Sequence, residues 1–322
     1  AYTYRGQTLS QDEVLAAYES RLESVYPCNL SQTGRQIQNV CYTAGCKSAP
    51  GLRVAKPKVL IPVFPGTNCE YDSAKAVRDA GAEAEILVIN NLSAEGIARS
   101  TEAFASALKT SQMIFLPGGF SGGDEPDGSG KFITAFFRNA AVSAGVTELL
   151  DHRNGLICGI CNGFQALIKL GLVPYGKIVE PKETNPTLTF NTIGRHQSKI
   201  VRTKIVSNLS PWLSLVRVGD VVNVPVSHGE GRFIVSDELL SQLIANGQIA
   251  TQYVDPEGNA SADIRYNPNN SVCAVEGITS PDGRVFGKMG HSERIGSGLY
   301  RNVEGNYNLR MFEAAVKYFR GE

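Results

Sequence analysis

Residues 155–163 read GLICGICNG, a short apolar run that ends in a cysteine set among glycines. The run predicts a buried strand, and the residues from Asn162 to about Leu170 predict a helix directly after it. Cys161, at the sharp turn between them, takes the place of serine in the G-x-S-x-G nucleophile elbow. Glycines suit this turn because larger side chains would clash, and the start of a helix favours a thiolate. The stretch therefore predicts a cysteine nucleophile at the end of a buried strand.

Two other interpretations of this cysteine compete with the nucleophile. Cys161 could be a buried structural thiol, and Cys158-x-x-Cys161 has the spacing of a redox pair. A redox pair normally straddles the start of its helix, whereas Cys158 falls inside the apolar strand. We therefore favour Cys161 as the nucleophile and Cys158 as a structural thiol.

Three further apolar runs precede the elbow, at residues 59–64, 85–90 and 112–117. Helical patterns at about 71–80, 93–108 and 131–150 follow them in turn. Alternating apolar strands and helices predict an α/β fold with a mostly parallel sheet flanked by helices. After residue 175 the pattern becomes β-like, with a hairpin around Pro281-Asp282-Gly283 and a closing helix at about 306–320. We therefore expect antiparallel strands to be added in the C-terminal half.

The first 55 residues have a different character from the rest of the chain. Residues 10–24 predict a helix, with Ser10 and Glu13 in a capping-box pattern. Residues 27–57 contain several glycines and prolines without periodicity, which is typical of a linker. The chain begins with Ala rather than Met, so we expect a fragment or a processed chain. This divides the chain into residues 1–55, a helix and linker, and residues 56–322, the main domain.

Composition excludes several classes of function. The 322 residues are 42% hydrophobic and 19% charged, with a formal net charge of zero, as in an ordinary globular enzyme. This balance argues against nucleic acid as a main partner. No apolar run is long enough to span a membrane, and the polar N-terminus does not resemble a signal peptide.

The seven cysteines and their spacing favour a reducing compartment. Their odd count and irregular spacing argue against a secreted disulfide framework, so we expect the cytoplasm. Cys28, Cys41 and Cys46 lie in a polar stretch without nearby histidines. Free or packed thiols are a better interpretation there than a zinc site, and no metal site is expected.

An elbow nucleophile needs backbone donors for the oxyanion that forms during the reaction. The N–H of Asn162, directly after the nucleophile, is one candidate. The preceding strand ends in Gly118-Gly119, where the lack of side chains allows close approach to a substrate. The N–H of Gly119 is therefore the second candidate, although a plain Gly-Gly turn is common.

A cysteine nucleophile also needs a histidine base and an acid that orients it. Of the four histidines, His152 and His196 lie in polar segments where a solvated or loop role is the default. The other two each occur as H-x-E: His228 with Glu230, and His291 with Glu293. Residues i and i+2 of a strand point the same way, so either pair places acid beside imidazole. The second pair follows a convincing strand, but spacing alone gives it only a modest preference.

The motifs together resemble a known family. GICNG (159–163), LPGGFSGGD (116–124) and GHSER (290–294) resemble the triad (class I) glutamine amidotransferases, whose fold is flavodoxin-like. FPGTNCEYD (64–72), ETNPTLTF (183–190) and VSHGEGRF (226–233) narrow the resemblance to the glutaminase domain of phosphoribosylformylglycinamidine synthases, and the segment before residue 56 is what implies their long, single-polypeptide form. The resemblance spans about residues 56–322, and residues 1–55 resemble the end of an upstream synthase domain.

The resemblance implies roles for individual residues. It implies Cys161 as nucleophile with His291 and Glu293 as its partners, and Gly119 and Asn162 at the oxyanion. It implies contacts to bound glutamine, or places in its pocket or at an interface, for Gly118, Ser121, Gln165, His196, Ser198, His228 and Glu230. Cys69 is matched as a marker of the subfamily, and a packed thiol is its default role. Position 292 is Ser where many triad amidotransferases carry Pro, so a less rigid loop is expected, with the geometry of the triad retained.

The implied function is the hydrolysis of glutamine and the transfer of its ammonia to a synthase partner. ATP and Mg²⁺ are expected only in that partner, because this chain has no G-x-x-x-x-G-K-[ST] loop and no cofactor site is expected in it. One alternative is a cysteine hydrolase of the DJ-1/PfpI type, which usually carries His where this chain has Asn162. Another is a non-catalytic docking domain, which an intact Cys, His and Glu set disfavours.

Overall fold

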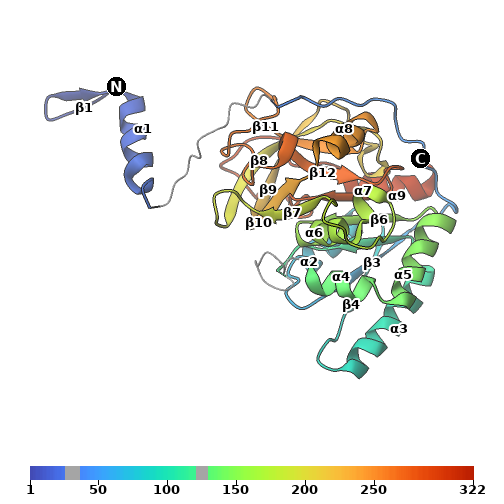
Figure 1. The fold of residues 1–322 in the computed structure, drawn as a ribbon. Coiled ribbons are helices and arrows are strands. Elements are labelled where there is room, and N and C mark those ends of the chain that lie inside the picture. Colours follow the sequence, from blue (N-terminus) through green and yellow to red (C-terminus); the bar gives the residue numbers. More distant parts are fainter. Residues whose placement is uncertain (26–36, 121–129) are drawn as a thin grey trace.

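The predicted α/β class is confirmed by a computed structural model that describes residues 1–25, 37–120 and 130–322. Within these residues, nine strands form one sheet flanked by helices (Figure 1). Their order across the sheet is β4 (Glu83–Val88), β3 (Lys58–Val63), β5 (Met113–Leu116), β6 (Leu156–Ile160), β13 (Val285–Lys288), β12 (Val275–Thr279), β11 (Ile249–Val254), β8 (Gln197–Ile205) and β9 (Val221–His228). The pairings from β4 through β6 to β13 are parallel, and those from β13 to β9 are antiparallel.

The parallel half follows the predicted alternation of strands and helices. Its helices are α2 (Glu70–Asp79), α3 (Ala94–Thr110), α4 (Lys131–Phe137), α5 (Ala140–Thr147) and α6 (Asn162–Leu170). The single helix predicted over about 131–150 is wrong. Asn139 has an extended backbone, and its side chain accepts a hydrogen bond from the N–H of Ala141, so a new helix starts there. The segment ends in a short π-helical turn, Glu148–His152.

Helices cover both faces of the sheet. Phe115 and Leu116 are successive residues of β5, so their side chains point to opposite faces. The ring of Phe115 lies 5.4 Å from that of Phe312 in the last helix, α9 (Met311–Arg320). On the other face, Leu116 contacts the backbone of Gly163 in α6 so closely that a side chain at Gly163 would clash. The strands between these helices are therefore fully buried, as their apolar sequences predict.

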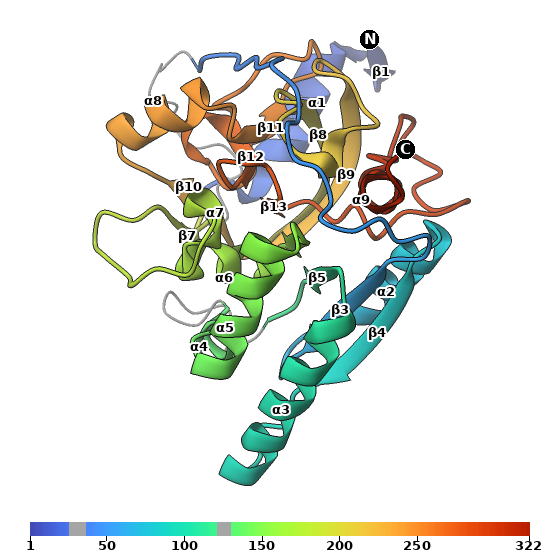
Figure 2. The ribbon, with the colours of Figure 1, turned by 90° about the vertical axis from the view of Figure 1, so that its right-hand side faces the viewer.

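The antiparallel half continues the same sheet, and in Figure 2 its strands β8, β9 and β11 lie above β3 and β4. The predicted hairpin around Pro281-Asp282-Gly283 is present and joins β12 to β13. The remaining elements are a two-stranded sheet of β7 (Thr187–Phe190) and β10 (Glu230–Ile234), the helices α7 (Leu172–Tyr175) and α8 (Asp237–Ala245), and the 3₁₀ turns Pro211–Leu213 and Val272–Ala274.

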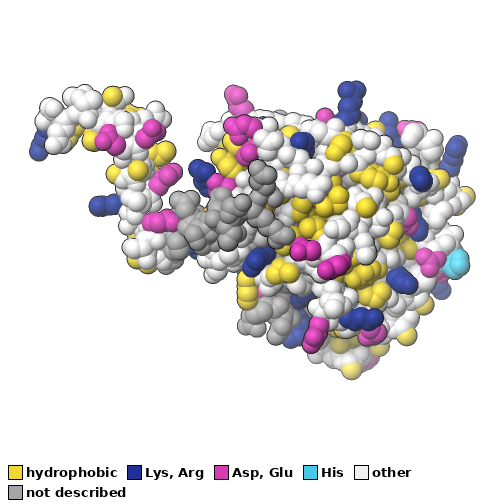
Figure 3. Space-filling view, turned by 45° about the horizontal axis from the view of Figure 1, so that its top comes forward, with side chains coloured by type: hydrophobic (Ala, Val, Ile, Leu, Met, Phe, Trp, Pro, Cys, Tyr) yellow, Lys and Arg dark blue, Asp and Glu magenta, His cyan; other side chains and the backbone are white. Residues whose placement is uncertain are grey.

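The N-terminal segment, residues 1–25, projects from the body of the molecule (Figures 1 and 3). It consists of a hairpin of β1 (Tyr2–Tyr4) and β2 (Gln7–Leu9), the helix α1 (Gln11–Glu19) and a 3₁₀ turn, Ser20–Leu22. The predicted capping box is confirmed: Ser10 Oγ accepts from Glu13 N at 3.1 Å, and Ser10 N donates to Glu13 Oε2 at 2.7 Å. Several large apolar side chains of this segment are exposed, Tyr4 and Tyr18 among them.

Residues 37–57, the described part of the predicted linker, run along the body. Their one isolated bridge joins Tyr42 to Ser207, and Val40 N donates to Gln252 Oε1 at 2.9 Å. This part of the linker is therefore packed against the main domain. Among the residues that the structure describes, no helix is both long and apolar enough to span a bilayer.

Candidate active site

Cys161 occupies a strained turn between β6 and α6. Its backbone angles are φ 53° and ψ −108°, a combination that L-residues rarely adopt. Such strain persists only where the surrounding structure holds it, and it is concentrated at functional sites. The predicted strand, turn and helix are all present, and the side chain of Cys161 is buried at the start of the nine-residue helix α6.

The glycines of the elbow are required by close packing. A Cβ on Gly159 would lie 2.6 Å from the carbonyl carbon of Gly163, and a Cβ on Gly163 would lie 2.1 Å from the carbonyl oxygen of Leu116. Both contacts are with backbone, which cannot move aside. The G-x-C-x-G pattern thus reflects the approach of α6 to β5 and β6.

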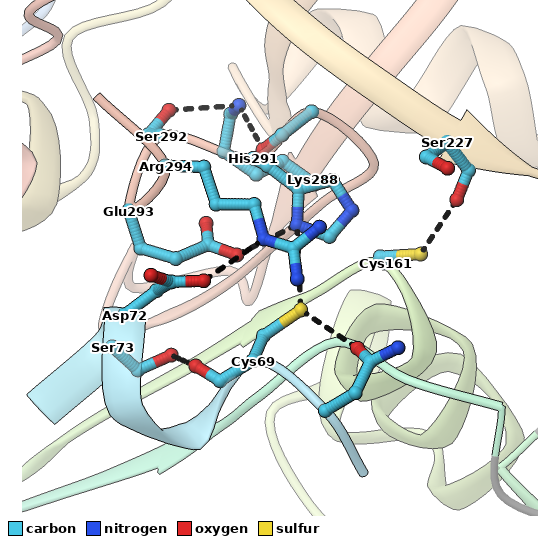
Figure 4. Close-up of polar contacts among 12 residues, drawn as sticks. Cys69, Asp72, Ser73, Cys161, Ser227, Lys288, His291, Ser292, Glu293 and Arg294 are labelled. Carbon is cyan, nitrogen blue, oxygen red and sulfur yellow. Dashed lines mark hydrogen bonds and ion pairs between the residues drawn. The ribbon is translucent and has the colours of Figure 1, made fainter. Parts of the chain in front are cut away.

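His291 and Glu293 are joined directly after β13. His291 Nδ1 lies 2.6 Å from Glu293 Oε1, and both side chains are buried (Figure 4). Burial alone would disfavour the imidazolium. The charge of Glu293 and contacts with Cys161, Cys69 and Glu293 outweigh burial and hold the pKa of His291 well above its usual value. The three side chains therefore lie together as one set, in which His291 is paired with Glu293 and the Cys161 thiol donates to the backbone oxygen of Ser227, 3.9 Å away.

Gly118 lies at the centre of this set. A Cβ there would lie 2.7 Å from His291 Cε1 and 3.4 Å from Cys161 Cβ. The next residue, Gly119, packs against the backbone of Gly66 and Thr67, with no room for a side chain. Gly119 follows β5 and Asn162 follows β6, so their backbones end neighbouring parallel strands, where ligands bind in such sheets.

Gln165 connects the elbow to the H-G-E motif. Its amide nitrogen donates to the backbone oxygen of Glu230 at 2.6 Å, and its amide oxygen accepts from Asn162 Nδ2 at 2.9 Å. Gln165, Asn162 and Glu230 are all buried. The structure thus brings three predicted site residues together beside the nucleophile.

His228 differs from His291 in its environment. It is buried and its Nδ1 lies 3.3 Å from Asn191 Oδ1, while its Nε2 has no hydrogen-bond partner among the residues that the structure describes. Burial, followed by the charges of His291 and His196, lowers the pKa of His228 to about 3. Gly229 turns the chain between β9 and β10, so the strand geometry expected for His228 and Glu230 is interrupted. His228 is therefore a neutral imidazole near the site.

Ser227 lies between the segment around His196 and the nucleophile, and it contacts both. His196 Nε2 lies 2.9 Å from Ser227 Oγ, and Cys161 Sγ lies 3.9 Å from the backbone oxygen of Ser227. Ser198 pairs with Ser227 across β8 and β9 and is exposed. Sequence reasoning missed Ser227, although it stands within the quoted VSHGEGRF motif. Ser121 lies outside the described residues.

Cys69 is a second buried thiol beside the triad. Its Sγ lies 3.9 Å from His291 Nδ1 and 3.1 Å from Asn68 Oδ1. Burial raises the pKa of the Cys69 thiol, and the hydrogen bond with His291 offsets part of that effect. Close by, Arg294 Nε lies 3.1 Å from Asp72 Oδ2, which ties the residue after Glu293 to α2.

The other described cysteines are free thiols. Cys158 is completely buried in β6, and burial raises its pKa well above the usual value, as expected of a structural thiol. It forms no disulfide with Cys161. Cys41 and Cys46 are also free, while Cys28 lies outside the described residues. In the described part of the chain, Cys69, His291 and Glu293 are the one group whose atoms are placed to share a metal ion.

Comparisons with known proteins find a family model and relatives that cover most of the chain. A family model for the CobB/CobQ-like glutamine amidotransferase domain matches residues 56–319. The phosphoribosylformylglycinamidine synthase subunit PurQ of Methanococcus maripaludis is 33% identical over 289 residues, which cover 82% of this chain and 97% of that protein. The subunit of the same name from Sulfurimonas denitrificans is 33% identical over 255 residues, which cover 79% and 98%.

A solved structure shows the same fold. PurLQS from Thermotoga maritima contains a chain that superposes with a TM-score of 0.57 at 24% identity, covering 82% of this chain and 99% of that one. The fold and the elbow cysteine define an α/β enzyme of the glutamine amidotransferase class. The chain belongs to the family of phosphoribosylformylglycinamidine synthase PurQ subunits.

Proposed function

We propose that Cys161, His291 and Glu293 carry out the glutaminase half of the phosphoribosylformylglycinamidine synthase reaction, in purine biosynthesis. The observation that carries this proposal is the position of His291. Its Nδ1 lies 2.6 Å from Glu293 Oε1, and its ring and the Cys161 side chain both approach Gly118, inside a buried site at the end of a nucleophile elbow. This arrangement provides a nucleophile, a base and an orienting acid in reach of one another.

The first half of the reaction forms a thioester. His291 holds the proton of Cys161, and the thiolate attacks the side-chain carboxamide carbon of glutamine. The N–H groups of Gly119 and Asn162 stabilise the oxyanion, and the loss of one such donor typically costs about 100- to 1,000-fold in rate. His291 then protonates the departing ammonia, which leaves a γ-glutamyl thioester on Cys161.

The second half releases glutamate. His291 accepts a proton from water, the resulting hydroxide attacks the thioester carbonyl, and Cys161 leaves as the thiolate. Glu293 keeps the imidazole oriented in both halves. The ammonia passes to the synthase partner, where we expect ATP and Mg²⁺ to be bound.

The proposal also assigns residues to a glutamine pocket beside the elbow. Gln165 and Glu230 line the elbow side, while His196 and Ser198 reach it through Ser227. His228 is neutral and so provides a polar surface without charge. We propose that these residues, with Gly118 and Ser121, surround the substrate.

The origin of residues 1–55 is a separate proposal. Residues 1–25 expose apolar side chains, which supports an original contact with an upstream synthase domain in a single long polypeptide. Free thiols in the described residues support a cytoplasmic location. An antiserum against residues 56–322 tests the first point, because it should detect one polypeptide far larger than this chain in the source cells. A band of subunit size would contradict it.

The catalytic proposal is tested by glutamate release from glutamine and by labelling. The complete enzyme should release glutamate and use ammonia directly, and Cys161→Ala should abolish only the first activity. A glutamine-mimicking diazo-ketone should alkylate Cys161 and not the neighbouring Cys69, with Cys69→Ala as the matched control. Loss of both activities in folded Cys161→Ala would contradict the division of labour, and the absence of labelling would favour a docking domain.

A further inference from the structure

A buried ion pair lies beneath the loop that carries His291. Lys288 Nζ lies 3.1 Å from Glu276 Oε1, and the two side chains are 1% and 0% exposed. Lysine and glutamate are almost never so completely buried unless they are paired. A buried ion pair gives little net stability compared with apolar residues of similar size. Its presence in the core therefore indicates a role other than stability.

The pair holds both neighbours of His291. Lys288 Nζ donates to the backbone oxygen of Gly290 at 2.7 Å and to Ser292 Oγ at 3.1 Å (Figure 4). Glu276 Oε1 accepts from the N–H of Gly290 at 2.7 Å. The residues before and after His291 are thus fixed by charge-assisted hydrogen bonds, which are the stronger kind.

Lys288 also contacts the nucleophile, through its backbone. Its backbone oxygen accepts from the N–H of Cys161 at 2.9 Å, at the end of the parallel pairing of β6 with β13. One residue therefore connects the backbone of the nucleophile with the loop of the base. A shift of Lys288 would change the separation between the Cys161 thiol and the His291 imidazole.

Glu276 is itself held rigidly by the sheet. Thr251 Oγ1 donates to Glu276 Oε2 at 2.5 Å, and the backbone oxygen of Glu276 accepts from Met289 N at 3.1 Å. These contacts come from β11 and from the residue after Lys288. The loop that carries His291 has no regular secondary structure, and the ion pair therefore holds it in a fixed position relative to the central sheet.

The hydrogen bond from Lys288 Nζ to Ser292 Oγ acts on the residue next to His291. Ser292 follows His291 directly and lies in a turn rather than in a strand or helix. The hydrogen bond from Lys288 therefore restrains this residue from outside the loop. We propose that Lys288 and Glu276 are positioning residues for His291 in the glutaminase reaction proposed above.

The proposal predicts a separation of kcat from KM. Lys288→Met leaves Glu276 buried without its partner and risks misfolding, so Lys288→Met with Glu276→Gln is the main variant. Its uncharged Gln retains an acceptor for Gly290. We expect kcat for glutamate release to fall about 10- to 100-fold, because small displacements of catalytic groups have effects of this size. KM for glutamine should stay within about twofold, since none of the glutamine contacts proposed above lies between residues 288 and 293.

Two comparisons separate positioning from a general loss of structure. Arg284→Met breaks the Arg284–Asp282 ion pair at the opposite end of β13 and should retain wild-type kcat. Melting temperatures are measured for each protein, so that a loss of kcat is compared at equal folding. Unchanged kcat in the folded double variant, or an equal fall in Arg284→Met, would overturn the proposal. Absence of glutamate release by the wild-type complete enzyme would instead overturn the glutaminase function itself.

Discussion

His291 Nδ1 lies 2.6 Å from Glu293 Oε1, although neither residue belongs to a strand. The contact forms in a turn, in which the N–H of Arg294 donates to the oxygen of His291 at 3.3 Å. The predicted contact between the two side chains is therefore present, but in a turn rather than at strand spacing. The other H-x-E pair is divided by the turn at Gly229, and its histidine faces Asn191 instead of an acid.

The first prediction concerns these two histidines. His291→Asn should lower kcat for glutamate release by about 100- to 10,000-fold, the usual contribution of a general acid–base group. His228→Asn should lower it by less than about tenfold, because that imidazole has no acidic partner. Steady-state kinetics with glutamine measure both. A larger loss of kcat in His228→Asn than in His291→Asn would show that His228, and not His291, is the catalytic base.

The second prediction is the pH dependence created by Glu293. The charge of Glu293 helps to hold the pKa of His291 above its usual value, against burial. A histidine pKa raised in the folded state contributes stability that is present below the unfolded value of about 6.5 and lost as pH rises through the folded value. Glu293→Gln removes this charge, so the pKa of His291 should fall and kcat should drop on the order of 1,000-fold or more.

NMR titration of the His291 ring measures the shift directly, and urea unfolding measures its effect on stability. The difference in free energy of unfolding between wild type and Glu293→Gln should be larger at pH 6 than at pH 9. Asp72→Asn, which alters the nearby ion pair with Arg294, is the control. An equal difference at both pH values would show that the carboxylate does not stabilise the imidazolium.

Much of the fold could be predicted because its strands are buried on both faces. Continuous apolar runs such as 112–117 have few other interpretations, and the glycines of the elbow mark a close backbone approach. The break at Asn139 was missed because a capping side chain inside an apolar, alanine-rich stretch does not interrupt helical periodicity. Local pattern describes one segment at a time, so it misses features of this kind.

The site was harder to predict from the sequence because its contacts join residues that lie far apart in the chain. Ser227 approaches Cys161, and Glu276 pairs with Lys288, only after β9 and β12 have joined the sheet. A lysine in the apolar stretch RVFGKMG was the available signal for a buried partner. Choosing between His228 and His291 required knowing which acid each ring faces, and that depends on the turns rather than on the spacing.

The third prediction is acid sensitivity caused by His228. Burial above all lowers the pKa of His228 to about 3, whereas an unfolded histidine has a value of about 6.5. Below pH 6.5 the unfolded state binds a proton that the folded state does not, so stability falls as pH decreases. Between pH 7 and pH 4.5 this should cost about 2–3 kcal/mol of unfolding free energy.

His228→Gln should remove this cost, and urea unfolding at pH 7 and pH 4.5 measures the change in both proteins. The variant should lose about 2–3 kcal/mol less than wild type between the two conditions. His152→Gln, at an exposed position, is the matched control and should follow wild type. If wild type and His228→Gln lose the same stability, the buried imidazole is not neutral.

The fourth prediction tests the packing of the elbow. Gly163→Ala places a Cβ 2.1 Å from the carbonyl oxygen of Leu116, and neither backbone can yield without moving α6 away from β5. Overpacking of this kind usually costs about 1–3 kcal/mol, so the melting temperature should fall. Displacement of α6 also moves Cys161 and Asn162, so glutamate release should fall further than the loss of folded protein explains. Gly296→Ala, where the added Cβ would lie 3.6 Å from Leu299 Cδ1, should retain both stability and activity. A stable Gly163→Ala enzyme with full activity would mean that the elbow tolerates a side chain and that its close approach to β5 is not required for catalysis.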